Sequence, residues 1–327
     1  MRAIQITERV DSPSKLRPSD IAQPRPSAEQ VLVQIHAAAA NFFDGLQIRG
    51  RYQVKPKLPY VLGAEFAGQI TEVGTQVKRW KVGDRVFGSA QGSFAQYVCA
   101  EEGMCLPVPS GWSYEAACGL FVTAPTSYCG LVTRANVQRG ETVLVHAAAG
   151  GISLAAVQIA KACGARVIAT ASTPEKLHIA ARYGADHVVN YREEDWVAQV
   201  NALGGADVIY DPVGEIEKDM RVVKWNGRIL VIGFAGGNIP NPPLNRVLLK
   251  NCSIVGVHWG AYSKNEKEMI PVIWRTLFEL IAQGKFRPTT YKVLYGLSDV
   301  GKALDALESR RTWGKVTIKI DHPSPKL

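Results

Sequence analysis

Two adjacent glycines, Gly150 and Gly151, stand between a continuously apolar stretch and a helical pattern. The apolar stretch, Thr142 to Ala147, is typical of a parallel strand covered on both faces. An apolar stripe at helical spacing follows the glycines, and Gly164 ends it. Backbone N–H groups of such a turn, with the positive end of the helix, bind a pyrophosphate. The order of strand, turn and helix therefore predicts a dinucleotide site, with Gly150, Gly151 and Ile152 as contacts.

Two positions of this turn differ from the usual G-x-G-x-x-G pattern. Ala147 stands where the first glycine might be, and Ser153 stands where the third is expected. The third glycine normally lets the helix and strand pack closely, so Ser153 predicts a wider approach. The alternative interpretation is a parallel strand–helix–strand unit whose glycines only make a tight turn.

The end of the next predicted strand, Arg166 to Thr170, bears on which dinucleotide is bound. A carboxylate there would bind the ribose 2′-hydroxyl of NAD, and none is present. Ser172 follows instead, with Thr173 as a helix N-cap, Pro174 at the first helical position and Lys176 one turn in. A 2′-phosphate carries nearly two negative charges and favours such donors. NADP(H), with Ser172 and Lys176 as contacts, is the predicted cofactor; the alternative is a solvated helix start.

The whole chain restricts the remaining classes of function. Its 327 residues suit two domains, and its formal charge of +9 is spread along the sequence without a basic block. This pattern fits an anionic cofactor and argues against nucleic acid as a partner. No run of eighteen apolar residues and no signal peptide is evident, so we expect a soluble protein of the cytoplasm without a membrane partner. The closing Pro-Lys-Leu, at 325–327, loosely resembles the S-K-L peroxisomal address.

The order of expected elements predicts an α/β fold. Before about residue 110 the pattern is strands and glycine-rich turns, which indicates a compact β domain. Later, strands alternate with helices, which predicts a doubly wound parallel sheet of the Rossmann type. The expected strands are 31–37, 66–73, 84–87, 94–100, 142–147, 166–170, 187–190, 206–211, 227–233, 252–258 and 315–320, with late helices at 269–283 and 300–309.

Several short motifs together resemble one known family. The chain is similar to the zinc-independent quinone oxidoreductases, the zeta-crystallin-like branch of the medium-chain dehydrogenase/reductase family, over nearly its whole length. The resemblance rests on the glycine turn and on Asn41-Phe42-Phe43-Asp44, Gly63-Ala64-Glu65-Phe66-Ala67-Gly68, Gly83-Asp84-Arg85-Val86, Asp211-Pro212-Val213-Gly214, Gly233-Phe234-Ala235-Gly236-Gly237 and Gly314-Lys315-Val316.

This resemblance implies a domain organisation and the loss of a metal. It implies a GroES-like β-barrel-type domain over residues 1–120, completed by 265–327, a Rossmann domain over 121–264, and a homodimer. Zinc-dependent relatives hold a catalytic zinc at positions that here are Asn41, Ala64 and Val122. Because none of these side chains ligates zinc as placed, no metal is expected.

The resemblance also implies roles for individual residues. Asn41 replaces a metal ligand with an amide that can hydrogen-bond the substrate or cofactor, and Tyr52 resembles a tyrosine over the nicotinamide pocket. The resemblance thus implies that both are catalytic hydrogen-bond donors, although a packed or interface aromatic is an equal alternative for Tyr52. Asp44 and Glu65 resemble framework residues. The implied cofactor contacts, besides those of the turn, are Asn41, Thr126 (with Thr123 as an alternative), Tyr191, Phe234 and Lys315. For Lys315, a solvated charge at the start of a strand is an equal alternative.

A site without a Lewis acid favours a particular class of substrate. Zinc stabilises the charge that develops on a carbonyl oxygen, so a simple ketone or alcohol is a poor substrate without it. A quinone delocalises the charge of an incoming hydride and needs only hydrogen-bond donors. We therefore predict an NADPH-dependent quinone oxidoreductase. The alternatives are an enoyl or enone reductase acting on an α,β-unsaturated carbonyl, and an NADPH-binding sensor or structural protein with little turnover.

Overall fold

The computed structural model describes residues 1–193 and 195–322 and divides into two compact units. The first unit contains residues 1–122 and the segment that begins at Pro288, and the second contains residues 123–287. Each unit has its own sheet and its own buried core. The Pro-Lys-Leu sequence at 325–327 lies outside the described residues.

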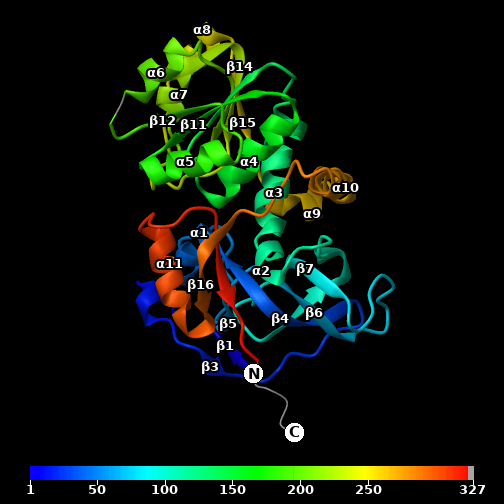
Figure 1. Ribbon diagram of the computed structural model, residues 1–327. Helices are drawn as coiled ribbons and strands as arrows, with labels where there is room; N and C mark the ends of the chain where they lie inside the picture. Colours follow the sequence, from blue (N-terminus) through cyan, green and yellow to red (C-terminus); the bar gives the residue numbers. More distant parts are fainter. Residues whose placement is uncertain (194, 323–327) are drawn as a thin grey trace. The chain divides into compact units, whose positions relative to one another are not determined.

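The first unit is built on a seven-stranded sheet in the order β16-β17-β4-β6-β7-β9, with β8 paired to β4 (Figure 1). The sheet is antiparallel apart from the β16–β17 pair, and apolar side chains such as Ile35, Phe66 and Ile318 fill its core. Its elements are β1 (Arg2–Ala3), β2 (Gln5–Ile6), η1 (Pro13–Lys15), β3 (Ser19–Asp20), β4 (Gln30–Ala40), α1 (Phe42–Ile48), β5 (Tyr60–Val61), β6 (Glu65–Val73), β7 (Arg85–Ser89), β8 (Tyr97–Glu101), η2 (Glu102–Met104), β9 (Cys105–Pro107), α2 (Tyr114–Ala117), β16 (Thr290–Gly296), η5 (Leu297–Asp299), α11 (Val300–Glu308) and β17 (Lys315–Lys319).

The second unit is built on a six-stranded parallel sheet in the order β12-β11-β10-β13-β14-β15. This order reverses direction between β10 and β13, which is the switch point of a Rossmann fold. The predicted α/β fold with a doubly wound parallel sheet is therefore confirmed. Its elements are η3 (Cys129–Arg134), β10 (Thr142–Val145), α4 (Gly151–Ala162), β11 (Arg166–Ala171), α5 (Pro174–Arg182), β12 (His187–Asn190), α6 (Trp196–Ala202), β13 (Ala206–Asp211), α7 (Ile216–Val222), β14 (Val223–Val231), α8 (Leu244–Lys250), β15 (Ser253–Gly256), η4 (Trp259–Ala261), α9 (Tyr262–Asn265) and α10 (Met269–Ala282).

Helices cover both faces of the parallel sheet, α4 and α5 on one face and α6 and α7 on the other (Figure 1). The strands are buried on both sides, so they are almost continuously apolar, as in Thr142–Val145. Apolar residues of α6 and α7, among them Trp196 and Met220, pack on strand residues such as Ile209. The burial holds the carboxyl ends of β10 and β13 side by side.

The helix α10 corrects the predicted domain boundary. The sequence predicts residues 265–287 as part of the first unit, but they group with the second. Ile273, Trp274 and Leu277 form the buried stripe of α10. The Arg287 backbone N–H then donates to the Gln158 side chain on α4 at 2.9 Å. These contacts hold the segment to the parallel-sheet unit until Pro288.

One helical run, Tyr114–Arg134, is long and apolar enough to cross a membrane by length and composition. It includes α2, α3 (Leu120–Tyr128) and η3. However, 72% of its apolar window is buried inside the structure, as in a core helix. Polar residues such as Glu115 and Thr123 interrupt the run, so the sequence shows no uninterrupted apolar stretch there.

Candidate functional site

Asn41 is the N-cap of α1 and lies in a buried polar cluster of the first unit. Its Nδ2 donates to Glu65 Oε2 at 2.9 Å and to the Ala39 carbonyl at 3.3 Å. Its Oδ1 accepts from Lys315 Nζ at 2.7 Å. Both amide protons are therefore directed at protein acceptors, and the Asn41 side chain also forms a capping box with the Asp44 backbone N–H.

Lys315 and Glu65 complete this cluster from β17 and β6. The Lys315 Nζ lies 2.8 Å from Glu65 Oε2, and the other carboxylate oxygen accepts the Val122 backbone N–H at 2.7 Å. The Lys315 stem crosses Gly119, where an added Cβ would lie 2.8 Å from two of its carbons. Because an ammonium has three protons, one proton of Lys315 remains after these two contacts. The structure thus brings together Asn41, Glu65 and Lys315.

Asp44 is fully buried on the first turn of α1. Its Oδ2 accepts the Asn41 backbone N–H at 2.7 Å, whereas Oδ1 has no hydrogen-bond partner among the described residues. Burial raises the pKa of Asp44 to about 7, although the Asn41 N–H and the Lys315 charge act in the opposite direction. Its framework role is consistent with the N–H contact that fixes the start of α1.

Tyr52 is half-buried and stacks on Phe43, with ring centroids 5.1 Å apart and an interplanar angle of 19°. Burial, and secondarily the Asp44 charge, raises the pKa of the Tyr52 hydroxyl. The hydroxyl therefore stays protonated at neutral pH and can act as a donor. The stack fixes the ring beside α1, so the packed and catalytic interpretations are compatible.

The glycine turn lies at the switch point of the parallel sheet. The first strand ends at Val145, and Gly150 is the N-cap of the twelve-residue α4, which begins at Gly151. Ala147, where a first glycine was considered, has the left-handed φ of 46° that glycine favours. Ser153, in the place of the third glycine, is buried and donates to the His146 carbonyl at 2.9 Å. The serine thereby joins the helix to the strand.

Ser127 on α3 holds the same turn and was missed from the sequence. Its hydroxyl lies within hydrogen-bond distance of the Ile152 carbonyl, at 2.8 Å, and of the Tyr210 hydroxyl, at 3.0 Å. Thr126, the predicted cofactor contact, is its buried neighbour, and Thr123 lies one turn earlier. A single serine in a helix gives no signal of such a role, because helices commonly contain serine.

The end of β11 carries the residues predicted to select the dinucleotide. Thr173 is the N-cap of α5 and accepts the Lys176 backbone N–H at 3.3 Å, with Pro174 at the first helical position, as predicted. Ser172 and Lys176 are both partly exposed. Tyr191, which follows β12, is exposed, and its backbone N–H donates to the Ala171 carbonyl at 3.2 Å. Tyr191 therefore lies beside the end of β11.

The loop after β13 is fixed by one carboxylate. Asp211 Oδ1 accepts the backbone N–H groups of Val213 and Gly214 at 2.7 and 2.9 Å, and Oδ2 accepts that of Glu215. Phe234, on the loop after β14, packs near Gly214, where an added Cβ would lie 3.3 Å from its ring. The structure thus brings Phe234 to the loop that follows the switch-point strand.

His146 and Asp219 form a buried pair that was not predicted from the sequence. The ring lies 2.8 Å from Asp219 Oδ1 and 2.9 Å from Thr170 Oγ1, and it meets Trp196 edge-on. Burial disfavours the imidazolium, but the carboxylates of Asp219, Asp211 and Glu215 together outweigh this effect and raise the pKa of His146. The pair links the end of β10 to α7. Its signal in the sequence was a lone histidine, which is more often structural than catalytic.

The three positions compared with zinc ligands lie in the first unit. Asn41 is engaged with Glu65 and Lys315, and Ala64 and Val122 have aliphatic side chains. Within residues 1–193 and 195–322, no group of three or more His, Cys, Asp or Glu side chains is arranged to hold a metal ion.

Two family models match this chain. Residues 27–110 match the alcohol dehydrogenase GroES-like domain, and residues 151–275 match the zinc-binding dehydrogenase domain. With the Rossmann strand order and the glycine turn, these matches define a two-domain oxidoreductase. The chain belongs to the medium-chain dehydrogenase/reductase family, among its quinone oxidoreductases.

Named relatives are similar over most of their length. The chain is 38% identical to quinone oxidoreductase-like protein 2 homolog of Nematostella vectensis, covering 88% of this chain and 81% of the relative. It is 37% identical to quinone oxidoreductase-like protein 2 of Mus musculus, covering 91% and 87%. A quinone oxidoreductase of Escherichia coli, solved in complex with NADPH, has a TM-score of 0.88 at 30% identity, covering 98% of this chain and 100% of that one.

Proposed function

We propose that this protein is an NADPH-dependent reductase of quinones. The observation that carries the proposal is the end of β11, where Ser172 and Lys176 replace the carboxylate of an NAD site. The NADPH complex of the Escherichia coli relative supports the same cofactor.

The second unit has a donor set that fits a dinucleotide. The N-terminus of α4, with Gly150 as its N-cap, offers backbone N–H groups and a positive helix end to a pyrophosphate. Ser172 and Lys176 offer a hydroxyl and an ammonium to a 2′-phosphate, and the Tyr191 backbone is bonded to the end of β11 at Ala171. Thr126 and Phe234 are the further proposed contacts.

The first unit supplies the polar groups proposed for the reaction. Lys315 can donate one more hydrogen bond, because only two of its three protons are engaged by Asn41 and Glu65. An ammonium held by Glu65 and Asn41 would stabilise negative charge that develops on a substrate oxygen. Tyr52, kept protonated, would be a second donor. When bound, the reduced nicotinamide would supply the hydride.

The side chains of this cluster favour a conjugated acceptor. Asn41, Ala64 and Val122 stand where zinc-dependent relatives have metal ligands, and hydrogen-bond donors replace the Lewis acid. A quinone spreads the incoming charge over a conjugated system and needs only such donors. The same reasoning admits an α,β-unsaturated carbonyl, which is therefore an arm of the test.

The cofactor is tested by Lys176→Ala, with Lys264→Ala, an exposed lysine of α9, as the matched control. We expect Lys176→Ala to weaken NADPH binding at least tenfold and to leave NADH binding almost unchanged, because only NADPH has the 2′-phosphate. Fluorescence titration measures both affinities. Equal losses for the two cofactors would refute the assignment.

The substrate class is tested by NADPH oxidation with 1,4-benzoquinone, an enoyl thioester and a simple enone. Turnover of the quinone is the expected result. Turnover of only the thioester or enone would replace the proposed substrate with an activated alkene. Tight NADPH binding without turnover of any of the three would indicate a sensor or structural protein.

We also propose a homodimer formed through α8 and β15. The strand β15 ends the described parallel sheet, and Leu244, Leu248 and Leu249 of α8 are 70–78% exposed. A second copy would cover this apolar row. Light scattering after size exclusion should give twice the mass of one chain, and Leu248→Asp should give the monomer, whereas Val82→Asp, at another exposed apolar position, should not. A monomeric wild-type protein would refute the dimer.

A further inference from the structure

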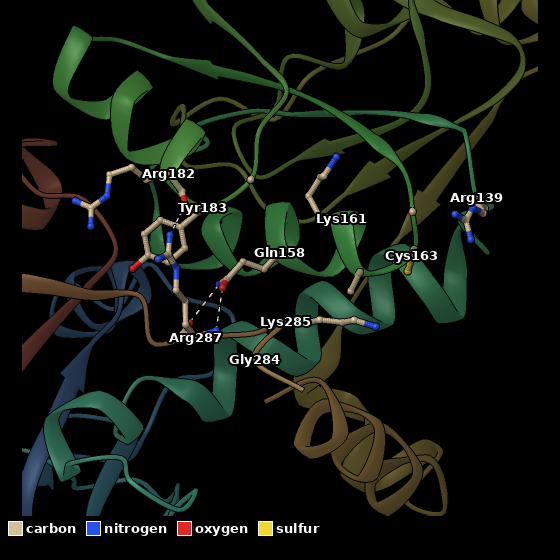
Figure 2. Close-up of a pocket in the computed structure, with 12 residues that line it drawn as sticks. Arg139, Gln158, Lys161, Cys163, Arg182, Tyr183, Gly284, Lys285 and Arg287 are labelled. Atoms are coloured by element: carbon tan, nitrogen blue, oxygen red, sulfur yellow. Dashed lines mark hydrogen bonds between the residues drawn. The ribbon is translucent and has the colours of Figure 1, made fainter. Parts of the chain in front are cut away.

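A pocket of about 560 Å³ lies in the second unit (Figure 2). Its lining includes Cys163 and Gly164, after α4, and Tyr183 and Gly184, after α5. These positions precede β11 and β12, whereas the glycine turn follows β10. The pocket is therefore separate from the proposed dinucleotide contacts.

The pocket is lined by five cationic residues. They are Arg139, Lys161, Arg182, Lys285 and Arg287, and none of the described residues that line the pocket is acidic. Figure 2 shows Arg182 and Arg287 beside Tyr183 at one end and Arg139 near Cys163 at the other. Positive charge is thus distributed along the whole pocket.

Several of these side chains are held by defined contacts. Added Cβ atoms on Gly164 and Gly184 would lie 2.9 Å from Arg139 Cγ and 3.0 Å from Lys161 Cγ, so both stems pack over glycine turns. The Arg287 guanidinium lies 4.3 Å from the Tyr183 ring centroid. Lys161 is paired with Asp186 at 2.8 Å, outside the pocket lining.

Helix C-termini explain the position of only two of these five cations. Lys161 and Arg182 lie in the last turns of α4 and α5, where the negative helix end favours a cation. Arg139 precedes β10, however, and Lys285 and Arg287 follow α10. Segments far apart in the sequence thus bring further cations to one pocket, where they repel one another. A bound anion would relieve this repulsion.

We propose that this pocket binds a small anion that carries two or more phosphate groups. The volume lies within the range of small-molecule pockets, and a single phosphate would reach only part of the row of cations. A guanidinium group can donate two parallel hydrogen bonds to two oxygens of one phosphate, and each lysine adds a compact positive charge. Inorganic polyphosphates and nucleoside diphosphates share this chemistry.

Isothermal titration of the full chain tests the pocket with inorganic tripolyphosphate and with ADP, each with and without saturating NADPH. Binding of tripolyphosphate should persist with NADPH present, and Arg139→Ala/Lys285→Ala should weaken it at least tenfold. Comparable affinity for ADP would show that phosphate groups suffice, whereas tighter binding of ADP would show that the nucleoside contributes.

The exposed Arg275 of α10 gives the matched control, because it does not line the pocket. Arg275→Ala should bind tripolyphosphate as the wild type does, and thermal melting should show that every variant is folded. NADPH affinity should be the same in the double variant and the wild type. No binding by the wild type, or loss with Lys176→Ala but not with the double variant, would overturn the proposal. The latter result would assign the anion to the dinucleotide site.

Discussion

Two lysine–carboxylate pairs have the same 2.8 Å separation in different surroundings. Lys315 and Glu65, in the first unit, have side chains that are 7% and 0% exposed. Lys161 and Asp186, in the second unit, are each 36% exposed. By distance alone, the two pairs would contribute equally to the free energy of unfolding. However, removing a charge from water costs free energy, and a buried charge that has lost its partner strongly destabilises the fold. Burial therefore decides what each pair contributes.

The same difference separates the roles proposed for the two regions. Lys315 and Glu65 have further partners in Asn41 and the Val122 backbone, so their positions are fixed. Lys161 lines a pocket with other cations, and its pair with Asp186 is partly exposed to solvent. A buried network suits a site that must keep its geometry, and an exposed cluster suits reversible binding.

The largest effect is expected from Lys315→Met, which leaves the Glu65 carboxylate buried without its cation. We expect a loss of about 3–5 kcal/mol in the free energy of unfolding, measured by urea denaturation. Lys319→Met, on the exposed end of the same strand, is the control and should change it little. Lys315→Met combined with Glu65→Gln should recover part of the loss. A single variant as stable as the wild type would remove the contrast between the two pairs.

Asp44 is a buried carboxyl group that, unlike Glu65, has one oxygen without a hydrogen-bond partner in the described structure. With its pKa raised by burial to about 7, the native state holds a proton that the unfolded state releases near pH 4. Stability from this group therefore falls as pH rises from about 4 to 7. The stability advantage of Asp44→Asn over the wild type should grow by about 2–3 kcal/mol between pH 5 and pH 8. Parallel urea curves at both pH values measure this change, and a constant difference would contradict it.

A smaller loss is expected from Gly164→Ala, at a turn that supports the cationic pocket. Its φ of 82° disfavours a side chain, and an added Cβ would meet the Arg139 stem. We expect a loss of about 1–2 kcal/mol in thermal unfolding, together with weaker tripolyphosphate binding. Gly103→Ala, where an added Cβ meets nothing within 4 Å, should be nearly neutral. If Gly164→Ala bound tripolyphosphate as tightly as the wild type, the position of the Arg139 side chain would not be important for binding of the anion.

The smallest effect is expected from Lys161→Met, which removes the exposed pair. Such pairs contribute about 0–1 kcal/mol and are screened by salt. Urea denaturation at low and high salt should show a small loss that shrinks as salt increases. A loss as large as that of Lys315→Met would show that exposure does not set the contribution.

Local patterns predicted most of the second unit. The strands His187–Asn190 and Ala206–Asp211 have the predicted bounds, because each has apolar central residues between clear turns. The N-cap of α5 at Thr173 and the helix end before Gly164 were also predicted correctly. The strand β10 ends at Val145 and not at the predicted Ala147, because Ala147 already has a turn conformation.

Features that depend on distant segments were not visible in local patterns. Asn41 and Lys315 are 274 positions apart, and only the family resemblance placed both at one site. The predicted donor role of Asn41 toward a substrate did not account for Glu65 and the Ala39 carbonyl, which take both amide protons. The cations of the pocket span Arg139 to Arg287, so no local run of basic residues indicated it.

Ala147 restricts the backbone conformation of the glycine turn more than a glycine at this position would. Its left-handed backbone conformation is unfavourable for alanine and persists because the surrounding segments impose it. Glycine at this position would relax the strain but would also allow the segment many more conformations. The alanine therefore favours a loop that is preorganised before its ligand arrives, so that less conformational entropy is lost on binding.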